Sequence, residues 1–541
     1  MKKTWTKVLA LLCAATACAP IAGCGGGGDN GIDNTKTQLF VFNYDGGVGH
    51  KWLDAVVARF EKDFAETEFT EGKKGVQIIQ RNDRTSIEQL VAKMSTSREE
   101  VFFAENVNYY NCIAEGAFLD ITDIMEKPLT EYGETESIVD KLYPDQRDFY
   151  QASNGRYYAM PHAQSPTLIT YDADLFDKHF LFFDQEGELT KRSTDEGKSY
   201  GADNLPGTYD DGLPATYEEF YTLCDTMIGR GIAPMTWSGM YEFYMTRFSA
   251  QLRADFDGAE ADVAYNLNGT MSKLVDTIDE DGNVTYKDPV TIVDNTNGYE
   301  IFSSASYYYT FKFFEDIYTN EYYFSKSFNT SVSHTDAQKN FLLSRFSSKV
   351  QDIGMLVEGL YWVNESSSAF ADMESYANSS LQERNLRIMP LPKATGAQVG
   401  EQTTVVDSLN QMAFISAYID EDKKELAKTF LRYCETQKSL EEFVQTTNLT
   451  RNFKVDYSNI YDDLAPYTQS IIDFLGGVRY LMPASDNPIF QKNYSAFSDD
   501  YQMGTISDPD PMIAIKSGKT AEQLFNAFRS KYNANTWKDI L

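Results

Sequence analysis

The stretch from Gly155 to Phe176 constrains the fold of this chain more than any other. It holds two short runs rich in aromatic and β-branched residues, each bounded by turn-forming residues, a pattern typical of strands. Pro161 and Pro166 lie between the runs, and because each lacks a backbone donor, the joint cannot be a regular central strand. The polar side chains near these prolines are His162, Gln164 and Ser165. We interpret the segment as a crossover between two lobes, lined with hydrogen-bonding groups.

Strands alternate with helices along the first part of the chain. Residues 38–44 predict a strand, and apolar residues at helical spacing follow from Leu53 to Phe64. Further strands are predicted over 75–80 and 101–104. This alternation predicts an α/β fold with a mainly parallel sheet covered on both faces. Because 541 residues are too many for one small core, we expect two lobes.

The later part of the chain is less regular. Residues 183–215 predict an irregular acidic stretch, and residues 255–300 predict a loop or hairpin insertion with a turn at Asp281-Gly282. Capping boxes mark three helix starts, at Thr85–Glu88, Thr216–Glu219 and Ser439–Glu442. Other predicted helices span 303–318, 423–435, 457–474 and 520–532, and other predicted strands span 354–362, 387–392 and 411–416.

The first 23 residues have the pattern of an export signal. Three lysines precede an apolar stretch from Val8 to Ala19, which is too short to span a bilayer. The following Ile-Ala-Gly-Cys resembles the lipobox of bacterial lipoproteins, in which Cys24 is lipidated and becomes the new N-terminus. Residues 24–37 would then form a flexible tether. The alternatives are an ordinary signal peptide with a chance cysteine, and lipidation at Cys18.

The formal net charge of −32 limits the partners of this chain. Loss of the three lysines in residues 1–23 would make it −35. A surface this acidic repels nucleic acid and anionic lipid, so membrane attachment must be covalent. The same excess of acid also aids solubility. Beyond Cys24, the mature chain would keep only Cys112, Cys224 and Cys434, which do not form a disulfide framework.

Catalytic, nucleotide and metal motifs are absent or incomplete. There is no G-x-S-x-G or H-E-x-x-H sequence, and the four histidines have no metal-ligand spacing. Two Gly-Lys-Ser/Thr tripeptides, at Gly197 and Gly518, lack the first glycine of a phosphate loop. The acidic run before Gly282 has Thr277 where a calcium loop needs aspartate. We therefore predict no catalysis, no cofactor and no metal, although a carboxylate pair for glycoside hydrolysis is a spatial arrangement that sequence leaves open.

The glycine-rich loop 45–49 follows the first strand and precedes a helix. Trp52 stands where a dinucleotide fingerprint needs glycine, which argues against cofactor binding. Open α/β sheets bind ligands at the carboxyl ends of their strands, so Asp45 is a candidate ligand-binding residue. A plain tight turn explains the same residues equally well.

Most of the aromatic side chains, which make up 14% of the sequence, must belong to the core. Four lie next to polar or glycine-rich breaks, namely Trp237, Tyr241, Tyr361 and Trp362. An indole or phenol ring can cover the apolar face of a pyranose while acids and amides bind its hydroxyls. These four residues are therefore candidates for sugar binding, with core packing as the alternative.

The mature chain resembles the extracellular solute-binding proteins of bacterial ABC importers, in the carbohydrate-binding group that includes maltodextrin-binding proteins. The motifs that carry the resemblance are the lipobox, 42–45, 155–161, 170–176, 354–362, 390–393 and 425–431, in this order. The resemblance implies two α/β lobes, joined by crossovers, that close on a ligand. Lobe 1 would comprise residues 38–162 and 412–455, and lobe 2 residues 167–410 and 457–541.

The resemblance also implies which residues face the ligand. They are Asp45 in the first loop, Glu105, Asn106 and Asn108 after the third strand, Gln164 and Ser165 in the crossover, and the aromatic residues Tyr241, Tyr361 and Trp362. His162, from the proline-bracketed crossover, and Trp237, from the aromatic residues next to a polar break, are further candidate ligand-binding residues. Ala104 occupies a position where a stacking aromatic residue is familiar, which leaves the size and identity of the ligand open.

We therefore expect a lipid-anchored receptor outside the cytoplasm, held at the cell membrane through Cys24. It would capture a carbohydrate, an oligosaccharide, by hinge closure and deliver it to the permease of an ABC transporter. We expect a monomer that performs no catalysis and binds no cofactor, metal or nucleic acid. The alternatives are a lipid-anchored glycan hydrolase and a surface protein that binds carbohydrate for adhesion.

Overall fold

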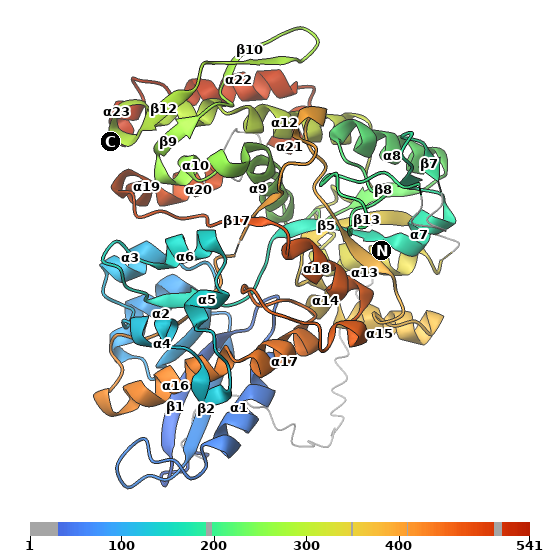
Figure 1. Ribbon diagram of the computed structural model, residues 1–541. Coiled ribbons are helices and arrows are strands. Elements are labelled where there is room, and N and C mark those ends of the chain that lie inside the picture. Colours follow the sequence, from blue (N-terminus) through green and yellow to red (C-terminus); the bar gives the residue numbers. More distant parts are fainter. Residues whose placement is uncertain (1–30, 191–196, 348–349, 408, 502–510) are drawn as a thin grey trace, which may run out of the picture.

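The protein folds into two lobes, each built on its own mixed sheet (Figure 1). The computed structural model describes residues 31–190, 197–347, 350–407, 409–501 and 511–541. The predicted signal peptide, Cys24 and the first part of the tether lie outside these residues. The α/β fold with two lobes is as predicted, whereas the exact residues that bound each lobe stay a prediction.

The first lobe is built on a five-stranded sheet in the order β2-β1-β3-β16-β4. The bounds are β1 Thr37–Tyr44, β2 Val76–Asp83, β3 Val101–Ala104, β4 Ala159–Pro161 and β16 Met412–Ile415. Strands β1, β2 and β3 are parallel, as predicted, whereas β16 runs antiparallel to β3 and β4. The reason is that β16 enters the sheet directly from a crossover between the lobes and not through a covering helix.

Helices cover both faces of this sheet. They are α1 Trp52–Asp63, α2 Ile87–Lys93, α3 Tyr109–Ala114, α4 Thr122–Glu126, α5 Ile138–Lys141, α6 Pro144–Tyr150, α16 Lys424–Cys434 and α17 Gln437–Thr447. Late in the sequence, α16 and α17 return to the first lobe and pack against α1 (Figure 1).

None of the three predicted capping boxes forms in full. Helix α17 begins earlier than predicted, and its N-cap is Thr436, whose side chain accepts a hydrogen bond from the backbone of Ser439. The N-cap of α2 is Ser86 and not the predicted Thr85, and the Ser86 side chain makes no capping hydrogen bond. The Thr85 hydroxyl instead accepts a hydrogen bond from Arg81 at 2.8 Å. At the start of α8, the Thr216 side chain caps the backbone of Glu219 as predicted, but the Glu219 carboxylate accepts from the backbone of Ala215 at 2.7 Å instead of from that of Thr216.

The second lobe is built on a four-stranded sheet in the order β14-β5-β13-β8. The bounds are β5 Thr167–Asp172, β8 Ala233–Thr236, β13 Ile353–Gly359 and β14 Leu386–Met389. The β13 strand is parallel to β8, and β5 is antiparallel to both β13 and β14. The crossover strand β5 thus lies inside the sheet of the lobe that it enters.

The second lobe holds most of the helices. Around the sheet lie α7 Ala173–Lys178, α8 Tyr217–Gly229, α9 Phe243–Asp257, α12 Ala305–Thr319, α13 His334–Ser344, α14 Trp362–Glu365, α15 Ser367–Ala377 and α18 Pro466–Leu475. Further out lie α10 Val263–Asn266, α11 Asp294–Asn297, α19 Pro488–Lys492, α20 Tyr494–Tyr501, α21 Pro511–Lys516, α22 Ala521–Lys531 and α23 Trp537–Ile540. Among the described residues, no helix is both long and apolar enough to cross a membrane.

Both predicted insertions form short hairpins on the second lobe. The strands are β6 Phe182–Phe183, β7 Leu189–Thr190, β9 Asn268–Met271, β10 Val275–Ile278, β11 Val284–Tyr286 and β12 Val290–Val293. The predicted turn joins β10 to β11, and Gly282 adopts a φ of +83°, a conformation that glycine tolerates best. The three described cysteines, Cys112, Cys224 and Cys434, are buried free thiols.

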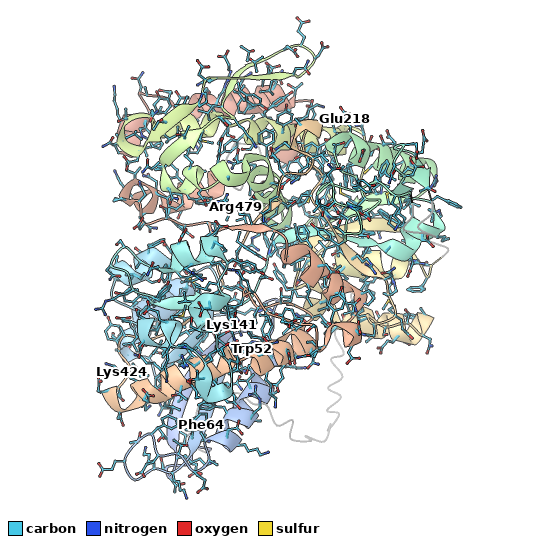
Figure 2. All side chains as sticks on the ribbon, in the orientation of Figure 1. Trp52, Phe64, Lys141, Glu218, Lys424 and Arg479 are labelled. Carbon is cyan, nitrogen blue, oxygen red and sulfur yellow. The ribbon has the colours of Figure 1, made fainter. Side chains whose placement is uncertain are left out.

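Three crossovers join the lobes. The first runs from β4 to β5 and is the proline-bracketed stretch, the second runs from β15 (Thr404–Val406) to β16, and the third follows α17. Strand β15 pairs in parallel with β17 (Arg479–Leu481), and Figure 2 shows Arg479 between the two lobes. The helix predicted over 457–474 begins only at Pro466, because proline favours the first helical turn and disfavours the interior.

Candidate ligand site between the lobes

A cavity of about 260 Å³ lies between the two lobes. Its lining comes from the first lobe and a crossover through Tyr44, Gly46, Gly47, Arg84, Glu105 and Leu409, and from the second lobe through Tyr241, Phe243, Tyr244, Arg247, His334, Tyr361 and Glu365. Tyr44 ends β1, and Arg84 and Glu105 directly follow β2 and β3. The cavity therefore lies at the carboxyl ends of parallel strands, where open α/β sheets bind ligands.

The two lobes touch at one edge of this cavity through Gly47 and Tyr361. A Cβ atom on Gly47 would lie well under 3.0 Å from three ring carbons of Tyr361, and a Cβ on Gly359 would also overlap this ring. The Tyr361 side chain is thereby enclosed, with a relative exposure of 4%. Only a residue without a side chain at position 47 lets the lobes approach this closely.

Two carboxyl groups reach the cavity from opposite lobes. Burial raises the pKa of Glu105 in the first lobe, although Arg247 and hydrogen bonds with Tyr44 and Gln411 oppose the shift. Burial likewise raises the pKa of Glu365 in the second lobe to about 7. Both groups therefore hold their protons more tightly than an exposed glutamate does.

A buried amide links Glu365 to a deeper acid. Nε2 of Gln338 lies 3.3 Å from Oε2 of Glu365 and 3.3 Å from Oε2 of Glu358, and Ser366 donates to Oε1 of the same amide at 2.7 Å. Burial, reinforced by the neighbouring Glu365, raises the pKa of Glu358 well above its usual range. Glu358 therefore holds its proton more tightly than an exposed glutamate does, which favours its neutral form in this wall of the cavity.

Three basic side chains line the cavity. Arg84 donates from Nε to the backbone oxygen of Asp45 at 2.7 Å, and the Arg247 guanidinium lies 4.6 Å from the ring centroid of Phe243. Within the described parts of the chain, no carboxylate lies within 4.0 Å of either guanidinium. Burial and Arg84 lower the pKa of His334, whose buried Nδ1 has no hydrogen-bond partner among the described residues.

The rim of the cavity on the second lobe is aromatic. Tyr241 and Phe243 are 36% and 39% exposed, with ring centroids 5.7 Å apart. The Tyr241 ring also lies 5.4 Å from that of His334. Solvent-exposed aromatic faces beside charged and hydroxyl groups can hold a ligand with one apolar face and a polar edge.

The structure brings three of the predicted site residues together in the cavity, namely Glu105, Tyr241 and Tyr361. Asp45 lies beside the cavity, where its carboxylate is 2.8 Å from Nδ1 of His50. Asn106 adopts a φ of +57° in the loop after β3, and Asn108 caps the start of α3 by accepting from the backbone of Asn111 at 3.4 Å. These three residues belong to the loops that shape the site rather than to its lining.

The other predicted residues are buried away from the cavity lining. The His162 ring packs 4.9 Å from Trp52 and 5.0 Å from Phe103, and burial lowers its pKa well below the usual range. Trp237 packs against Tyr318, Tyr323 and Phe328, and Trp362 donates from Nε1 to Oγ1 of Thr170 at 3.2 Å. Gln164 and Ser165 are buried in hydrogen bonds at the crossovers. In this conformation these five side chains pack in the core or form hydrogen bonds at the crossovers.

Sequence reasoning missed several lining residues. They are Tyr44, Arg84, Phe243, Tyr244, Arg247, His334 and Glu365. Arg84 directly follows β2, so the strand-end rule that pointed to Asp45 could also have found it. The residues of α9 and α13 gave no such signal, because only the tertiary packing decides which helix start faces the other lobe.

Two α/β lobes, three crossovers and a cavity between them define a hinged ligand-binding protein. The chain belongs to the bacterial extracellular solute-binding protein family, whose model matches residues 51–440. This result confirms the predicted membership among the solute-binding proteins of ABC importers and an extracytoplasmic location. No curated protein matches the chain in sequence.

Two solved structures are similar in fold. One is the solute-binding protein RafE in complex with raffinose, with a TM-score of 0.56 and 13% sequence identity, covering 93% of this chain and 100% of that chain. The other is the apo form of RafE from Streptococcus pneumoniae, with a TM-score of 0.55 and 14% identity, covering 94% of this chain and 99% of that chain. At this identity the likeness establishes the two-lobe fold, and both neighbours are binding proteins.

Proposed function

We propose that this protein is a lipid-anchored receptor that binds a carbohydrate between its lobes and delivers it to the permease of an ABC importer. The observation that carries the proposal is the interlobe cavity, in which the exposed rings of Tyr241 and Phe243 adjoin charged and hydroxyl groups. This combination suits a sugar ring, which has an apolar face and a polar edge. The raffinose complex of RafE supports the same class of ligand.

The volume of the cavity bears on the length of the carbohydrate. About 260 Å³ is below the range of roughly 300–1,000 Å³ that is usual for ligand sites. We therefore propose a short saccharide, with Glu105, Tyr241 and Tyr361 in contact with it, rather than a long chain. Binding needs no catalysis, because closure requires only that the ligand prefer the closed state.

The anchor part of the proposal rests on the lipobox-like sequence before Cys24. Replacement of Cys24 by serine should release the protein from the membrane fraction into the soluble fraction. A Cys24→Ser variant that stays in the membrane fraction would contradict covalent anchoring at this residue. The proposal also treats the receptor as a monomer, which size-exclusion chromatography of the soluble variant tests.

A thermal-shift panel tests the binding function. The panel contains mono- and oligosaccharides, amino acids and peptides, and a ligand at 100 times its Kd adds about 2.7 kcal/mol of stability. We expect stabilisation by saccharides only, recovered chemically intact after incubation, since a hydrolase would cleave them. Unchanged melting curves across the saccharides would contradict a sugar receptor.

Two tyrosine variants test whether the saccharide binds at the aromatic rim of the cavity. Replacement of Tyr241 by alanine should weaken saccharide affinity by about 0.5–1.5 kcal/mol or more, since an aromatic contact contributes about that much beyond buried area. Tyr418 is a matched control, because it is 54% exposed and follows β16 at the far end of the sheet. Equal affinities of Tyr241→Ala and Tyr418→Ala would contradict a site at this rim.

A further inference from the structure

The two arginines of the interlobe cavity form no ion pair with its two glutamates, whereas Nε2 of His334 lies 3.8 Å from Oε2 of Glu365. Four formally charged side chains line it, Arg84 and Glu105 from the first lobe and Arg247 and Glu365 from the second. Salt bridges normally bring such groups within 4.0 Å, yet none joins these four among the described residues. The two acids and the two bases are instead satisfied to different extents.

Each acid has neutral hydrogen-bond donors. The Glu105 carboxyl accepts from Nδ2 of Asn106 at 3.4 Å, and that of Glu365 accepts from Nε2 of Gln338 at 3.3 Å. Burial raises the pKa of both acids, and it raises that of Glu365 to about 7, so the negative charge of Glu365 is reduced near neutral pH. The arginines act on both acids through space, which opposes the rise in the pKa of each, but they donate no hydrogen bond to either carboxylate.

Neither arginine has a carboxylate within 4.0 Å among the described residues. Arg84 uses only Nε, towards a backbone oxygen, and Arg247 rests on the Phe243 ring, so most guanidinium donors of both residues point to no acceptor in the described chain. An arginine carries five N–H donors in a planar fork that fits a carboxylate with two parallel hydrogen bonds. Arg84 is exposed and Arg247 is half-buried, so water can solvate both guanidiniums in the free protein. A carboxylate that enters the cavity can replace this water with paired, charge-assisted hydrogen bonds.

We propose, on the basis of the proposed sugar-binding function, that the saccharide carries a carboxylate, which Arg84 and Arg247 bind from opposite lobes. The ligand class is thus a hexuronate or a short saccharide that contains one. A carboxylate shared by both lobes is bound fully only when the lobes are closed, so the same group favours closure. Buried Nδ1 of His334 lies at the same site and can serve a neighbouring hydroxyl.

The acidic surface of the protein does not oppose this assignment. The formal charge of −32 is spread over the whole chain, and at physiological ionic strength charges are largely screened beyond about 8 Å. A direct contact between guanidinium and carboxylate acts within hydrogen-bond distance and in a partly buried site. The local contact therefore outweighs the distant surface charge, which affects mainly the association rate.

Isothermal titration calorimetry with matched probes tests the proposal. The probes are D-galacturonate, D-glucuronate, their 1,4-linked disaccharides, the neutral methyl ester of each, and galactose and glucose. We expect at least one acid to bind about tenfold or more tightly than its methyl ester, which lacks the negative charge and carries one additional methyl group. Esters or neutral sugars that bind as tightly as every acid, or better, would overturn the carboxylate while leaving the sugar receptor intact. Absence of binding by any saccharide would instead contradict the proposed function.

An arginine variant tests whether the preference for the acid over its ester depends on the cavity. Replacement of Arg247 by methionine should abolish the preference for the acid over its ester, with a melting temperature close to that of the wild type. Arg230→Met is the matched control, because Arg230 lies at the end of α8 and donates to the backbone oxygen of Phe180 at 3.2 Å. If Arg247→Met keeps the full preference, the proposal is wrong. Arg84→Met is the second variant, with the same expectation.

Discussion

Two polar regions of this protein contain the same kinds of side chain but differ in how completely these are paired. In the hinge cluster, which we define as Gln164, Ser165, Asp407, Asn452 and Tyr480, each member is hydrogen-bonded to another. Ser165 and Asn452 donate to opposite oxygens of Asp407, each at 3.0 Å, and Gln164 donates to Asn452 at 3.2 Å and also to Tyr480. In the cavity, Arg84 donates only to a backbone oxygen, and neither the Arg247 guanidinium nor Nδ1 of His334 has a hydrogen-bond partner among the described residues.

We interpret the paired cluster as part of the hinge and the unpaired groups of the cavity as part of the ligand site. The hinge cluster joins side chains from the three crossovers and β17, so its bonds hold the segments on which the lobes pivot. A satisfied buried network stabilises and specifies a structure, whereas unsatisfied polar groups cost free energy unless something else binds them. We infer that the cavity keeps its unpaired groups for a ligand.

We expect the largest difference in the free energy of unfolding between a variant of a paired arginine and a variant of an unpaired arginine. Arg451, in the third crossover, forms an ion pair with Glu435, and both are essentially buried. Replacement of Arg451 by methionine leaves this acid without its partner, so we expect the free energy of unfolding to fall by about 3–5 kcal/mol. Urea unfolding of Arg451→Met and Arg247→Met measures the contrast. Equal losses in the two variants would contradict the distinction between hinge and cavity.

The pH dependence of stability tests whether Glu365 in the cavity is buried with a raised pKa. Burial raises the pKa of Glu365 from 4.5 to about 7, so the folded chain binds this proton more tightly than the unfolded chain. The contribution of Glu365 to stability is therefore full below about pH 4.5 and is lost as the pH rises through 7, by at most about 3 kcal/mol.

Glutamine has no such proton to lose. The melting temperature of Glu365→Gln should therefore match that of the ligand-free wild type near pH 4.5 and exceed it at pH 8. Differential scanning calorimetry from pH 4.5 to 8 measures the difference. A constant difference over this range would contradict the raised pKa.

A smaller effect is expected from one hydrogen bond of the hinge cluster. Ser165→Ala removes the donor to Asp407 but leaves Asn452 in place, so we expect a loss of about 1 kcal/mol in the free energy of unfolding. Saccharide affinity should change by less than about twofold. A larger loss of affinity without a loss of stability would place Ser165 at the ligand instead of the hinge.

Local sequence patterns predicted much of the fold. Strands β1 and β3 and the proline-bracketed crossover lie where the sequence indicated, because alternation, apolar runs and proline act within a few residues. Predictions failed where a competing local signal decided the boundary, as at Thr436, which caps α17 before Ser439 can. The antiparallel entry of β16 depends on the crossover from the other lobe and has no local signature.

The site was less predictable than the fold. Tyr241 and Trp237 lie four residues apart in the same polar and glycine-rich segment, yet one lines the cavity and the other packs in the core. Tyr361 and Trp362 are adjacent and differ in the same way. The sequence identifies aromatic residues near a break, but the packing of the lobe determines which ring faces the other lobe.

The contact between Gly47 and Tyr361 provides the most direct test of binding between the lobes. A methyl group at position 47 would overlap the Tyr361 ring and keep the lobes apart, whereas Gly396 has no neighbour within 4 Å of an added Cβ and is a matched control. The measurement is the affinity of wild type, Gly47→Ala and Gly396→Ala for the saccharide that most stabilises the wild type. We predict a loss of about tenfold or more for Gly47→Ala and wild-type affinity for Gly396→Ala. Equal affinity of all three proteins would contradict ligand binding by closure at this cavity.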